Sequence, residues 1–454
     1  MTYSAAIEFL YQLSWFGAKF GLTNTLKLAK LAGNPQQKLR FIHVAGTNGK
    51  GSTCAMLESI HRAAGLRVGL FTSPHLVAFS ERLQVNRRTI PEPEVARLVN
   101  QMQHLLEEGW GKTQAEPVGL QDTRPLSPSG TEQHPTFFEV VTIMALQYFA
   151  AQECDLVVWE TGLGGRLDAT NIVTPSASII TNIQFDHQNY LGETLASIAR
   201  EKAGIIKPHI PVITGANSPE ALQVISETAR NQNAPLTIVQ PVDIRKPPLD
   251  SLTLPLLGEH QKMNAAVALA AVKSLESTLP IADSAIREGL TRLHWPGRLQ
   301  LVKQSTTQQV LLDGAHNVGG AEMLAAALRE YFPNLQPSLI LGILRDKDWS
   351  RMCEILAPLA NRIVLVPVHS ERSAEPHGLA QTCRQANPKA EIFECPSLAE
   401  ALELTERDPF VTIAGSLYLV GEAMELLHLS AAKTNNERAL NEWTPLPRNP
   451  SITV

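Results

Sequence analysis

Residues 44–53 have the sequence V-A-G-T-N-G-K-G-S-T, a glycine-rich loop that contains a lysine. Its three glycines let the backbone adopt conformations that other residues rarely reach, so consecutive N–H groups can converge on an anion, and Lys50 adds a positive charge. An apolar run, 41–44, precedes the loop, and apolar residues at helical spacing follow it over 52–64. Strand, glycine loop and helix in this order predict an α/β fold with a phosphate site where the helix begins.

The loop differs from the usual P-loop at two points. Gly51 separates Lys50 from the hydroxyl residue, and Val44 stands where the first glycine is usual. The alternative is a glycine turn that carries a surface lysine. We favour nucleotide binding, with Ser52 or Thr53 offering a hydroxyl to Mg²⁺. The predicted nucleotide-binding residues of the loop are Gly46, Thr47, Asn48, Gly49, Lys50, Gly51, Ser52 and Thr53.

Strand-like apolar runs alternate with amphipathic runs along the chain, which predicts a parallel-rich sheet with helices on both faces. A second series of strand-like runs follows a break near 295–298. We therefore expect an ATP-binding domain over 1–297 and a smaller Rossmann-like α/β domain over 298–430. A stretch rich in Gly, Pro, Ser, Thr and Gln, 108–135, predicts a mobile loop inserted in the first domain. Polar residues 431–454 predict a loosely held tail.

Composition narrows the class of protein. The net charge is −5 and no basic run is sustained, which argues against nucleic acid as the main partner. No apolar stretch is long enough to cross a membrane, and the first residues lack the basic start of a signal peptide. The five cysteines are scattered without a C-x-x-C pair, so neither a zinc site nor a disulfide framework is expected. These features predict a soluble, cytoplasmic protein that binds neither nucleic acid nor membrane.

Several further motifs follow predicted strands. Together with the glycine loop they are HVAGTNGKGST (43–53), GLFTSPHL (69–76), FSERLQV (79–85), TFFE (136–139), ETGLGGRLDATN (160–171), FDHQNYLG (185–192), IAREKAGIIK (198–207), GEHQKMNAAVA (258–268), WPGRLQ (295–300), DGAHN (313–317) and AGSLYLVGE (414–422). These motifs resemble one family, the folylpolyglutamate synthase and dihydrofolate synthase branch of the Mur ligase superfamily. The resemblance runs from about residue 42 to residue 422, and the order and spacing of the motifs make coincidence implausible.

The resemblance implies a Mur-ligase-like central domain, a C-terminal Mur-ligase domain and an ATP-dependent ligase that attaches L-glutamate to folates. A carboxylate is a poor electrophile, so the γ-phosphoryl group of ATP would convert it to an acyl phosphate that the glutamate amine then attacks. Such transfer depends on positioning and on cations that neutralise charge. The implied acceptors are tetrahydrofolate and, in bifunctional members, dihydropteroate; the motifs do not decide between the two activities. A monomer is implied as well.

The resemblance also implies two Mg²⁺ ions. The positions that match the ligands in the family are Ser52, Ser73, Glu139, His187 and Lys202, the last in a carbamylated form. Taken without the family, His187 is more simply a histidine hydrogen-bonded beside Asp186, and Lys202 a lysine at a favourable helix end. Oxygen donors suit Mg²⁺ better than an imidazole.

The remaining candidates are assigned by position in the motifs. Asn264, Arg298 and Asp313 are expected to contact the nucleotide, and Lys50, Lys202, Arg298 and His316 to take part in the chemistry. Glu81, Arg82, Gly164, Arg166 and Ser416 are expected to contact folate or glutamate. The alternative for His316 is a polar turn, and for Ser416 a helix cap. Two other functions stay open, a Mur ligase acting on a cell-wall precursor and a P-loop ATPase or kinase.

Overall fold

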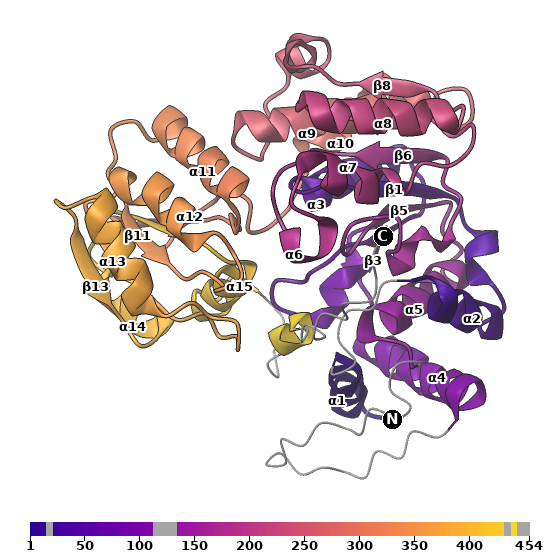
Figure 1. Ribbon diagram of the computed structural model, residues 1–454, viewed down its shortest axis with the longest axis horizontal. Helices are drawn as coiled ribbons and strands as arrows, with labels where there is room; N and C mark the ends of the chain where they lie inside the picture. The colour runs from indigo at the N-terminus through magenta and orange to yellow at the C-terminus, as the bar shows by residue number, and fades with distance from the viewer. Residues whose placement is uncertain (15–20, 112–133, 431–436, 443–454) are drawn as a thin grey trace.

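The computed structural model describes residues 1–14, 21–111, 134–430 and 437–442, and it shows two α/β lobes side by side (Figure 1). The N-terminal lobe, here the described residues before Trp295, holds an eight-stranded sheet, and the C-terminal lobe, residues 300–430, holds a six-stranded sheet. Two sheets with helices on both faces confirm the predicted fold class. The predicted domain boundary at residue 297 stays a prediction.

The first sheet has the strand order β4-β3-β2-β5-β1-β6-β7-β8. From β2 to β8 the neighbouring strands are parallel, and β3 and β4 add an antiparallel edge. This edge was not predicted, because strands of two and three residues show no periodicity. The strands are β1 (Phe41–Ala45), β2 (Val68–Phe71), β3 (Leu83–Val85), β4 (Arg88–Thr89), β5 (Leu156–Glu160), β6 (Ala177–Ile180), β7 (Val212–Thr214) and β8 (Leu236–Ile238).

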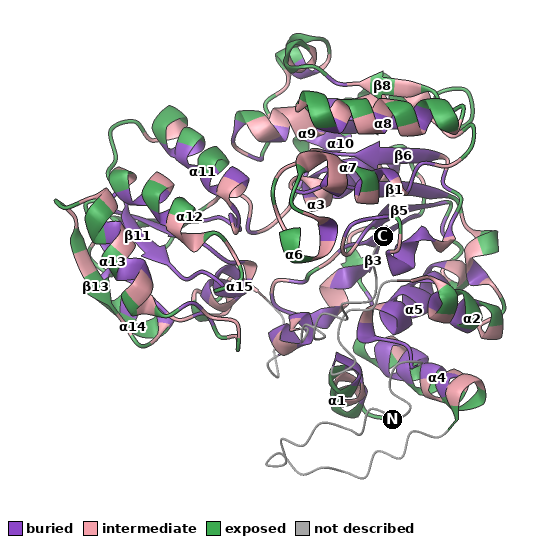
Figure 2. Ribbon diagram, viewed as in Figure 1, coloured by how far each residue is buried: buried purple, intermediate pink, exposed green. Residues whose placement is uncertain are grey.

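Helices cover both faces of this sheet, so its central strands are buried along their whole length (Figure 2). Alternate side chains of β5 enter different cores, as the pleat of a strand requires. Val157 and Trp159 pack with α1, α2, α4 and α5, whereas Leu156 and Val158 pack with α3, α9 and α10. The helices of this lobe are α1 (Tyr3–Ser14), α2 (Thr23–Leu31), α3 (Lys50–Ala63), α4 (Glu92–Trp110), α5 (Phe137–Ala151), α6 (Gln188–Leu191), α7 (Leu195–Ala203), α8 (Pro219–Asn231), α9 (Glu259–Ser274) and α10 (Asp283–Thr291).

The second sheet has the order β13-β12-β11-β14-β10-β9, with β9 antiparallel at one edge. Its strands are β9 (Gln300–Lys303), β10 (Gln309–Leu312), β11 (Ser338–Leu341), β12 (Arg362–Leu365), β13 (Glu391–Glu394) and β14 (Phe410–Ala414). Its helices are α11 (Val318–Tyr331), α12 (Trp349–Leu356), α13 (Pro376–Ala386), α14 (Leu398–Leu404) and α15 (Leu417–Leu426). Helices α11 to α13 pack on one face, and α14 and α15 pack on the other.

Short 3₁₀ helices connect the main elements. They are η1 (Pro35–Lys38), η2 (Phe79–Arg82), η4 (Ala169–Ile172), η5 (Pro241–Arg245), η6 (Leu249–Ser251), η7 (Ala357–Leu359) and η8 (Glu437–Asn441). Helix η8 lies between the two lobes, beside α1 of the N-terminal lobe, and its Arg438 pairs with Glu425 of α15 (Figure 1).

Two segments differ from the expectations. Helix α4 continues through Trp110, so residues 108–110 are helical; most of the expected inserted loop, 112–133, lies outside the described residues. The expectation of a loose tail is wrong for residues 437–441, since four of the five side chains of η8 are buried. The rest of the tail lies outside the described residues. In the part of the chain that the structure describes, no helix has the length and apolar character needed to cross a membrane.

Candidate active site between the two lobes

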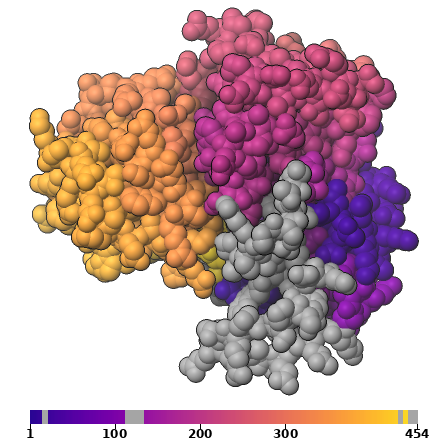
Figure 3. Space-filling model, in the orientation of Figure 1, coloured from indigo at the N-terminus to yellow at the C-terminus, as the bar shows by residue number. Residues whose placement is uncertain are grey.

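One cavity lies where the two lobes meet, and its lining comes from both lobes and from the segment around η8. Figure 3 shows the orange and yellow C-terminal lobe against the indigo and magenta N-terminal lobe. The carboxyl ends of parallel strands usually form the ligand crevice of such sheets, and residues after β1, β2, β5, β6 and β10 line the cavity. Most predicted site residues are among them: Gly46, Thr47, Asn48, Gly49, Lys50, Gly51, Ser52, Ser73, Arg82, Glu139, Gly164, His187, Lys202, Asn264, Arg298, Asp313, His316 and Ser416.

The glycine loop joins the end of β1 to the start of α3, which confirms the strand, loop and helix that the sequence predicts. Gly46 has φ 151° and Gly49 has φ 83°. A Cβ atom at Gly46 would lie 1.9 Å from Oγ1 of Thr181, and one at Gly49 would lie 2.3 Å from Oδ1 of Asn264. The loop therefore needs glycine for both conformation and space, and it directs the free N–H groups of the first turn of α3 into the cavity.

Two lysines converge on this loop. The Lys50 ammonium donates to the carbonyl oxygens of Gly46 and Thr47, each at 3.1 Å. The Lys202 ammonium, from the last turn of α7, donates to the same Gly46 oxygen at 2.8 Å. Burial, and then repulsion from Lys50, lower the pKa of Lys202 to about 7. Near neutral pH a large fraction of this lysine is a neutral amine, which is the nucleophilic form.

Side chains with oxygen donors also line the cavity near this loop. Of the two hydroxyls proposed for Mg²⁺, that of Ser52 belongs to a residue that lines the cavity, whereas Thr53 does not line it. Ser73 and Glu139 line the same cavity. The Glu139 carboxylate accepts hydrogen bonds from the Thr136 N–H, at 2.8 Å, and from the Thr25 hydroxyl, at 3.1 Å, so it also caps α5.

Glu160, at the carboxyl end of β5, begins a motif that was expected to follow a strand, but we assigned it no role of its own. It is buried in the cavity wall and accepts a hydrogen bond from the Ser73 N–H at 3.2 Å. Burial raises its pKa to about 7, even though Lys50, the Ser73 N–H, Arg298 and Arg82 favour the carboxylate. Its position at the end of a central parallel strand, at the start of the ETGLGG motif, is the signal that could have identified it.

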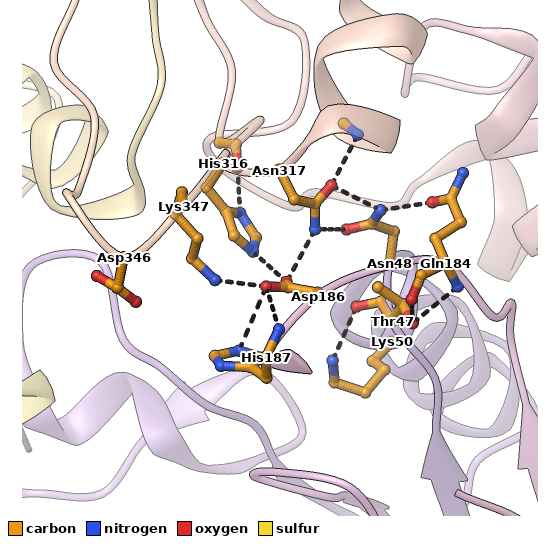
Figure 4. Close-up of polar contacts among 12 residues, drawn as sticks. Thr47, Asn48, Lys50, Gln184, Asp186, His187, His316, Asn317, Asp346 and Lys347 are labelled. Atoms are coloured by element: carbon orange, nitrogen blue, oxygen red, sulfur yellow. Dashed lines mark hydrogen bonds and ion pairs between the residues drawn. The ribbon is translucent and has the colours of Figure 1, made fainter. Parts of the chain in front are cut away.

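Asp186 is the centre of a polar network that joins the two lobes (Figure 4). Its carboxylate accepts from the Lys347 ammonium at 2.6 Å and from the Asn317 side-chain amide at 2.9 Å. The rings of His187 and His316 lie 3.9 and 3.8 Å from it. Burial opposes ionisation of Asp186, but His187, Lys347 and His316 outweigh burial and hold its pKa far below the ordinary value.

Both histidines of this network are neutral near pH 7. Burial, and then Lys347, lower the pKa of His187 to about 3 and that of His316 to about 4. Nδ1 of His316 lies 2.7 Å from the Gly314 carbonyl oxygen, which can only accept, so Nδ1 carries the proton and Nε2 keeps its lone pair. A neutral imidazole is the form that can accept a proton or bind a metal.

The glycine loop also contacts the C-terminal lobe directly. Asn48 and Asn317 exchange side-chain hydrogen bonds at 3.0 Å, and Asn48 donates to the Gln184 side chain at 2.7 Å. Asn317 in addition caps α11 by accepting from the Gly320 N–H. The functional residues that the sequence did not reveal here are Gln184, Asn317 and Lys347, and Asp186 was noted only as the neighbour of His187. Gln184, Asp186 and Asn317 stand in or next to quoted motifs, whereas Lys347 follows no motif.

Asp313 fixes the junction between the lobes, a role that we did not predict; its expected contact with the nucleotide stays a prediction. Its carboxylate accepts from the Leu299 N–H at 2.8 Å and from the Ala315 N–H at 2.9 Å. Arg298 lies half-buried beside it, and its guanidinium donates to the Gly297 carbonyl at 3.1 Å. Burial lowers the pKa of Arg298 although Asp313 and Glu160 oppose this, and the group remains a cation facing the cavity.

Three predicted site residues lie outside the cavity lining: Thr53, Glu81 and Arg166. The Glu81 carboxylate accepts from the N–H groups of three residues of its own turn, at 2.8 to 2.9 Å. Arg166 is paired with Glu201 at 2.8 Å. These contacts give Glu81 and Arg166 structural roles, and their assignment to substrate stays a prediction.

Ser416 is a helix cap, which was the alternative to substrate contact that the sequence left open. Its hydroxyl accepts from the Tyr418 N–H at 3.1 Å and caps α15. It also lines the cavity, so the cap and a substrate contact are compatible.

Comparisons with known proteins match almost the whole chain. Residues 95–272 match the family model described as Mur ligase middle domain, and residues 297–417 match the one described as Mur ligase, glutamate ligase domain. The dihydrofolate synthase/folylpolyglutamate synthase of Bacillus subtilis is 35% identical over 94% of this chain and 99% of its own length. The Escherichia coli protein of the same description is 33% identical over 85% of this chain and 86% of its own length.

Solved structures agree with these matches. A folylpolyglutamate synthase from Thermotoga maritima has a TM-score of 0.78 at 32% identity and covers 96% of this chain and 98% of its own. An Escherichia coli structure, FolC in complex with DHPP and ADP, has a TM-score of 0.79 at 30% identity and covers 94% of this chain and 98% of its own.

Proposed function

Because the chain belongs to the folylpolyglutamate synthase/dihydrofolate synthase family of Mur ligases, we propose that the cavity between its lobes is where it ligates L-glutamate to folates. ATP-dependent glutamate ligation to folates is the activity that this family membership gives the chain. The observation that supports the location is the shared lining: the glycine loop of the middle domain and the His316 region of the glutamate ligase domain face one cavity.

We infer a bifunctional enzyme that uses both tetrahydrofolates and dihydropteroate as acceptors. The support is the similarity to the Bacillus subtilis and Escherichia coli proteins, whose descriptions name both activities. The Escherichia coli structure with DHPP and ADP adds to it. A Lacticaseibacillus casei relative, 33% identical, is described as a folylpolyglutamate synthase alone, so similarity does not by itself separate the two possibilities.

On the ATP side, the chain supplies positive charge and free N–H groups where phosphates would lie. Lys50 would leave the carbonyl oxygens of Gly46 and Thr47 and turn to the β- and γ-phosphates, and Arg298 would neutralise the oxygens of the transferred group. Asn264, next to Gly49, and Asp313 at the junction complete the predicted nucleotide contacts. The acceptor carboxylate would thereby become an acyl phosphate.

The residues of the cavity fit Mg²⁺ by donor type. Among the described residues, no three His, Cys, Asp or Glu side chains gather as a metal-binding group. Magnesium, however, is commonly held by one or two carboxylates together with water and substrate phosphates. Ser52, Ser73 and Glu139 would hold one ion, and Glu139, His187 and Lys202 a second. When bound, these ions would neutralise charge on the transferred phosphoryl group.

The buried position of Lys202 suits the proposed carbamylation. A neutral amine attacks CO₂, a C–N bond forms, and one proton is released, which leaves a carbamate anion. The nearby Lys50 cation would stabilise that anion, whereas it repels a buried ammonium. The modification would convert the Gly46 contact into an oxygen ligand for a metal.

On the acceptor and amino-acid side, Arg82, Gly164 and Ser416 line the cavity and are the proposed contacts for folate and glutamate. The amine of glutamate must lose a proton when it attacks the acyl phosphate. We propose that His316 accepts this proton or orients the amine, because its imidazole is neutral and Nε2 carries no proton. We also propose that the chain acts as a monomer with its domain boundary near residue 297, where the glutamate ligase match begins.

The test is ADP release by the purified chain with ATP, Mg²⁺ and L-glutamate, with dihydropteroate, tetrahydrofolate or no acceptor. Release with both acceptors that requires glutamate supports the bifunctional assignment. Release with tetrahydrofolate alone restricts the enzyme to polyglutamylation. Release that needs neither glutamate nor acceptor contradicts the ligase and favours an ATPase.

A further inference from the structure

The segment 437–442, which we call the strap, is built into the cavity although it follows the C-terminal lobe in sequence. Leu440, Asn441 and Glu442 are among the residues that line the cavity. Figure 1 shows this segment as a short yellow helix between α15 and α1. No quoted family motif includes it, and the glutamate ligase match ends before it, at residue 417.

The strap is anchored on the N-terminal lobe through Glu437. Its carboxylate accepts from the Tyr3 hydroxyl at 3.0 Å and from the Phe79 N–H at 2.7 Å. Its carbonyl oxygen lies 2.9 Å from Nε2 of His75. Because a carbonyl only accepts, this contact places the proton of His75 on Nε2 and leaves Nδ1 as an acceptor.

That acceptor orients Arg82. The Nε–H of Arg82 donates to Nδ1 of His75 at 2.8 Å, and its Nη2 donates to the side-chain oxygen of Asn441 at 2.5 Å. The Asn441 amide in turn donates to the His75 carbonyl at 3.0 Å. The strap thus contacts Arg82 directly through Asn441 and indirectly through His75, and the two hydrogen bonds fix the plane of the guanidinium.

Arg82 is a buried cation without a carboxylate partner among the described residues. It is 3% exposed, and its contacts are His75, Asn441 and the ring of Phe137, whose centroid lies 5.3 Å away. Its Nη1 has no hydrogen-bond acceptor in the described part of the chain. Burial lowers the pKa of Arg82 to about 10, so it stays charged at neutral pH. Glu81 and Glu160 favour the charged form of Arg82, but neither forms an ion pair with it among the described residues. A buried, oriented guanidinium in a cavity wall is suited to bind an anion.

The surroundings favour a carboxylate of the amino-acid substrate over a phosphate. The strap faces the start of α15 in the C-terminal lobe, because Arg372 donates both to the Glu442 carboxylate, at 3.3 Å, and to the Tyr418 hydroxyl, at 3.1 Å. The phosphate-directed groups, Lys50 and the first turn of α3, belong to the glycine loop, and among the described residues no hydrogen bond or ion pair joins this loop to the strap.

We propose that the strap is a positioning element of the amino-acid site, in which Asn441 orients the Arg82 guanidinium to bind a carboxylate of the incoming glutamate. This inference rests on the proposed ligase function and assigns a role to a residue that does not itself have to touch substrate. A strap that merely joined the lobes would need no polar contact with a cavity-lining cation.

The test compares two substitutions at Asn441 with a control elsewhere. Asn441→Ala removes the contact, and Asn441→Asp places a carboxylate against Arg82, which neutralises the guanidinium and competes with substrate. Asn387→Ala is the matched control, because the Asn387 amide also makes two hydrogen bonds, to the carbonyls of Ala357 and Ala360, away from the cavity. Initial rates are measured as functions of glutamate, ATP and folate acceptor, together with the melting temperature of each variant.

We expect Asn441→Ala to raise the KM for glutamate about tenfold, as for the loss of a hydrogen bond to a charged group, with the KM for ATP within about twofold of wild type. Asn441→Asp should raise the KM for glutamate further, and its melting temperature should be no lower than that of Asn441→Ala. Asn387→Ala should lower the melting temperature and leave the KM for glutamate unchanged. A wild-type KM for glutamate in Asn441→Asp, or a rise confined to the acceptor KM, overturns the inference. Wild-type chain without glutamate-dependent ADP release would instead overturn the proposed function.

Discussion

The glycine loop and the strap form two sides of one cavity, and both control a cation, but they are built in different ways. The Lys50 ammonium is held by carbonyl oxygens three and four residues before it. The Arg82 guanidinium is held by His75 close in sequence and by Asn441, 359 positions away. The loop site is therefore local and made largely of backbone, whereas the strap site exists only after the chain has folded.

This difference has a chemical consequence. A site made of backbone N–H groups tolerates many side chains but depends on the glycines that shape it. A site made of a few side chains from distant segments depends on each of them and can be altered one residue at a time. We therefore expect changes around the glycine loop to affect ATP use and phosphoryl transfer, and changes around the strap to affect the amino acid.

The largest effect is expected for Lys202→Ala. This variant tests whether activity on the glycine-loop side of the cavity depends on a side chain as well as on the backbone of the loop. Loss of this side chain should lower kcat about 1,000-fold, as for the removal of a preorganised charged group, while circular dichroism and melting show an intact fold. Lys202→Arg is the companion variant, because it keeps the cation but cannot form the same carbamate. Wild-type turnover by either variant would contradict the proposed role of Lys202.

Gly46→Ala tests the backbone nature of the loop. The new Cβ atom would lie 1.9 Å from the Thr181 hydroxyl oxygen, and this hydroxyl donates to the Asn48 carbonyl at 2.7 Å. We expect the loop to be displaced, and the KM for ATP to rise about 100-fold, in line with a misplaced phosphate cradle. Gly65→Ala is the control, since Gly65 also has a positive φ but has open space around it and lies outside the cavity lining. Equal effects of the two variants would mean that backbone strain alone matters.

Glu160→Gln tests the buried carboxyl between the two sides. Burial raises its pKa from 4.5 to about 7, so the folded chain binds more protons than the unfolded chain between these values. Wild-type stability should consequently fall as the pH rises from about 5 to 8, by up to roughly 3 kcal/mol, and the glutamine variant should lack this contribution. Urea unfolding of both proteins at pH 5 and pH 8 measures it. A stability difference between them that does not change with pH would show that Glu160 titrates normally.

Ser416→Ala has the smallest expected effect and tests the C-terminal wall of the cavity. Loss of the cap on α15 should cost about 1 kcal/mol of stability. Thermal unfolding measures this cost, with Ser397→Ala, the cap of α14, as the control outside the cavity. If only Ser416→Ala also raises the KM for glutamate, the hydroxyl contacts substrate in addition to capping the helix.

Local features of this chain could be predicted from the sequence, because neighbouring residues determine them. The continuous apolar run of β5 and the glycines at 46 and 49 specify a buried parallel strand and a phosphate loop without knowledge of the rest. Most of the predicted site residues line one cavity, whereas Thr53, Glu81 and Arg166 do not.

Contacts between distant segments could not be predicted. Lys347 stands in no motif, and its contact with Asp186 joins residues 161 positions apart. The strap was expected to be a loose tail because it is polar, but its polar groups are buried and paired with His75, Arg82 and Tyr3. Composition cannot distinguish a solvated polar segment from one whose partners lie elsewhere in the chain.

The most direct measurement compares the same substitution on the two sides of the cavity, Asn264→Ala beside the glycine loop and Asn441→Ala in the strap. Initial rates of ADP release with varied ATP and varied glutamate give both KM values for each variant. The account predicts a raised KM for ATP only in Asn264→Ala and a raised KM for glutamate only in Asn441→Ala. If both variants shift the same KM, or neither shifts any, the division of the cavity into a phosphate side and an amino-acid side is wrong.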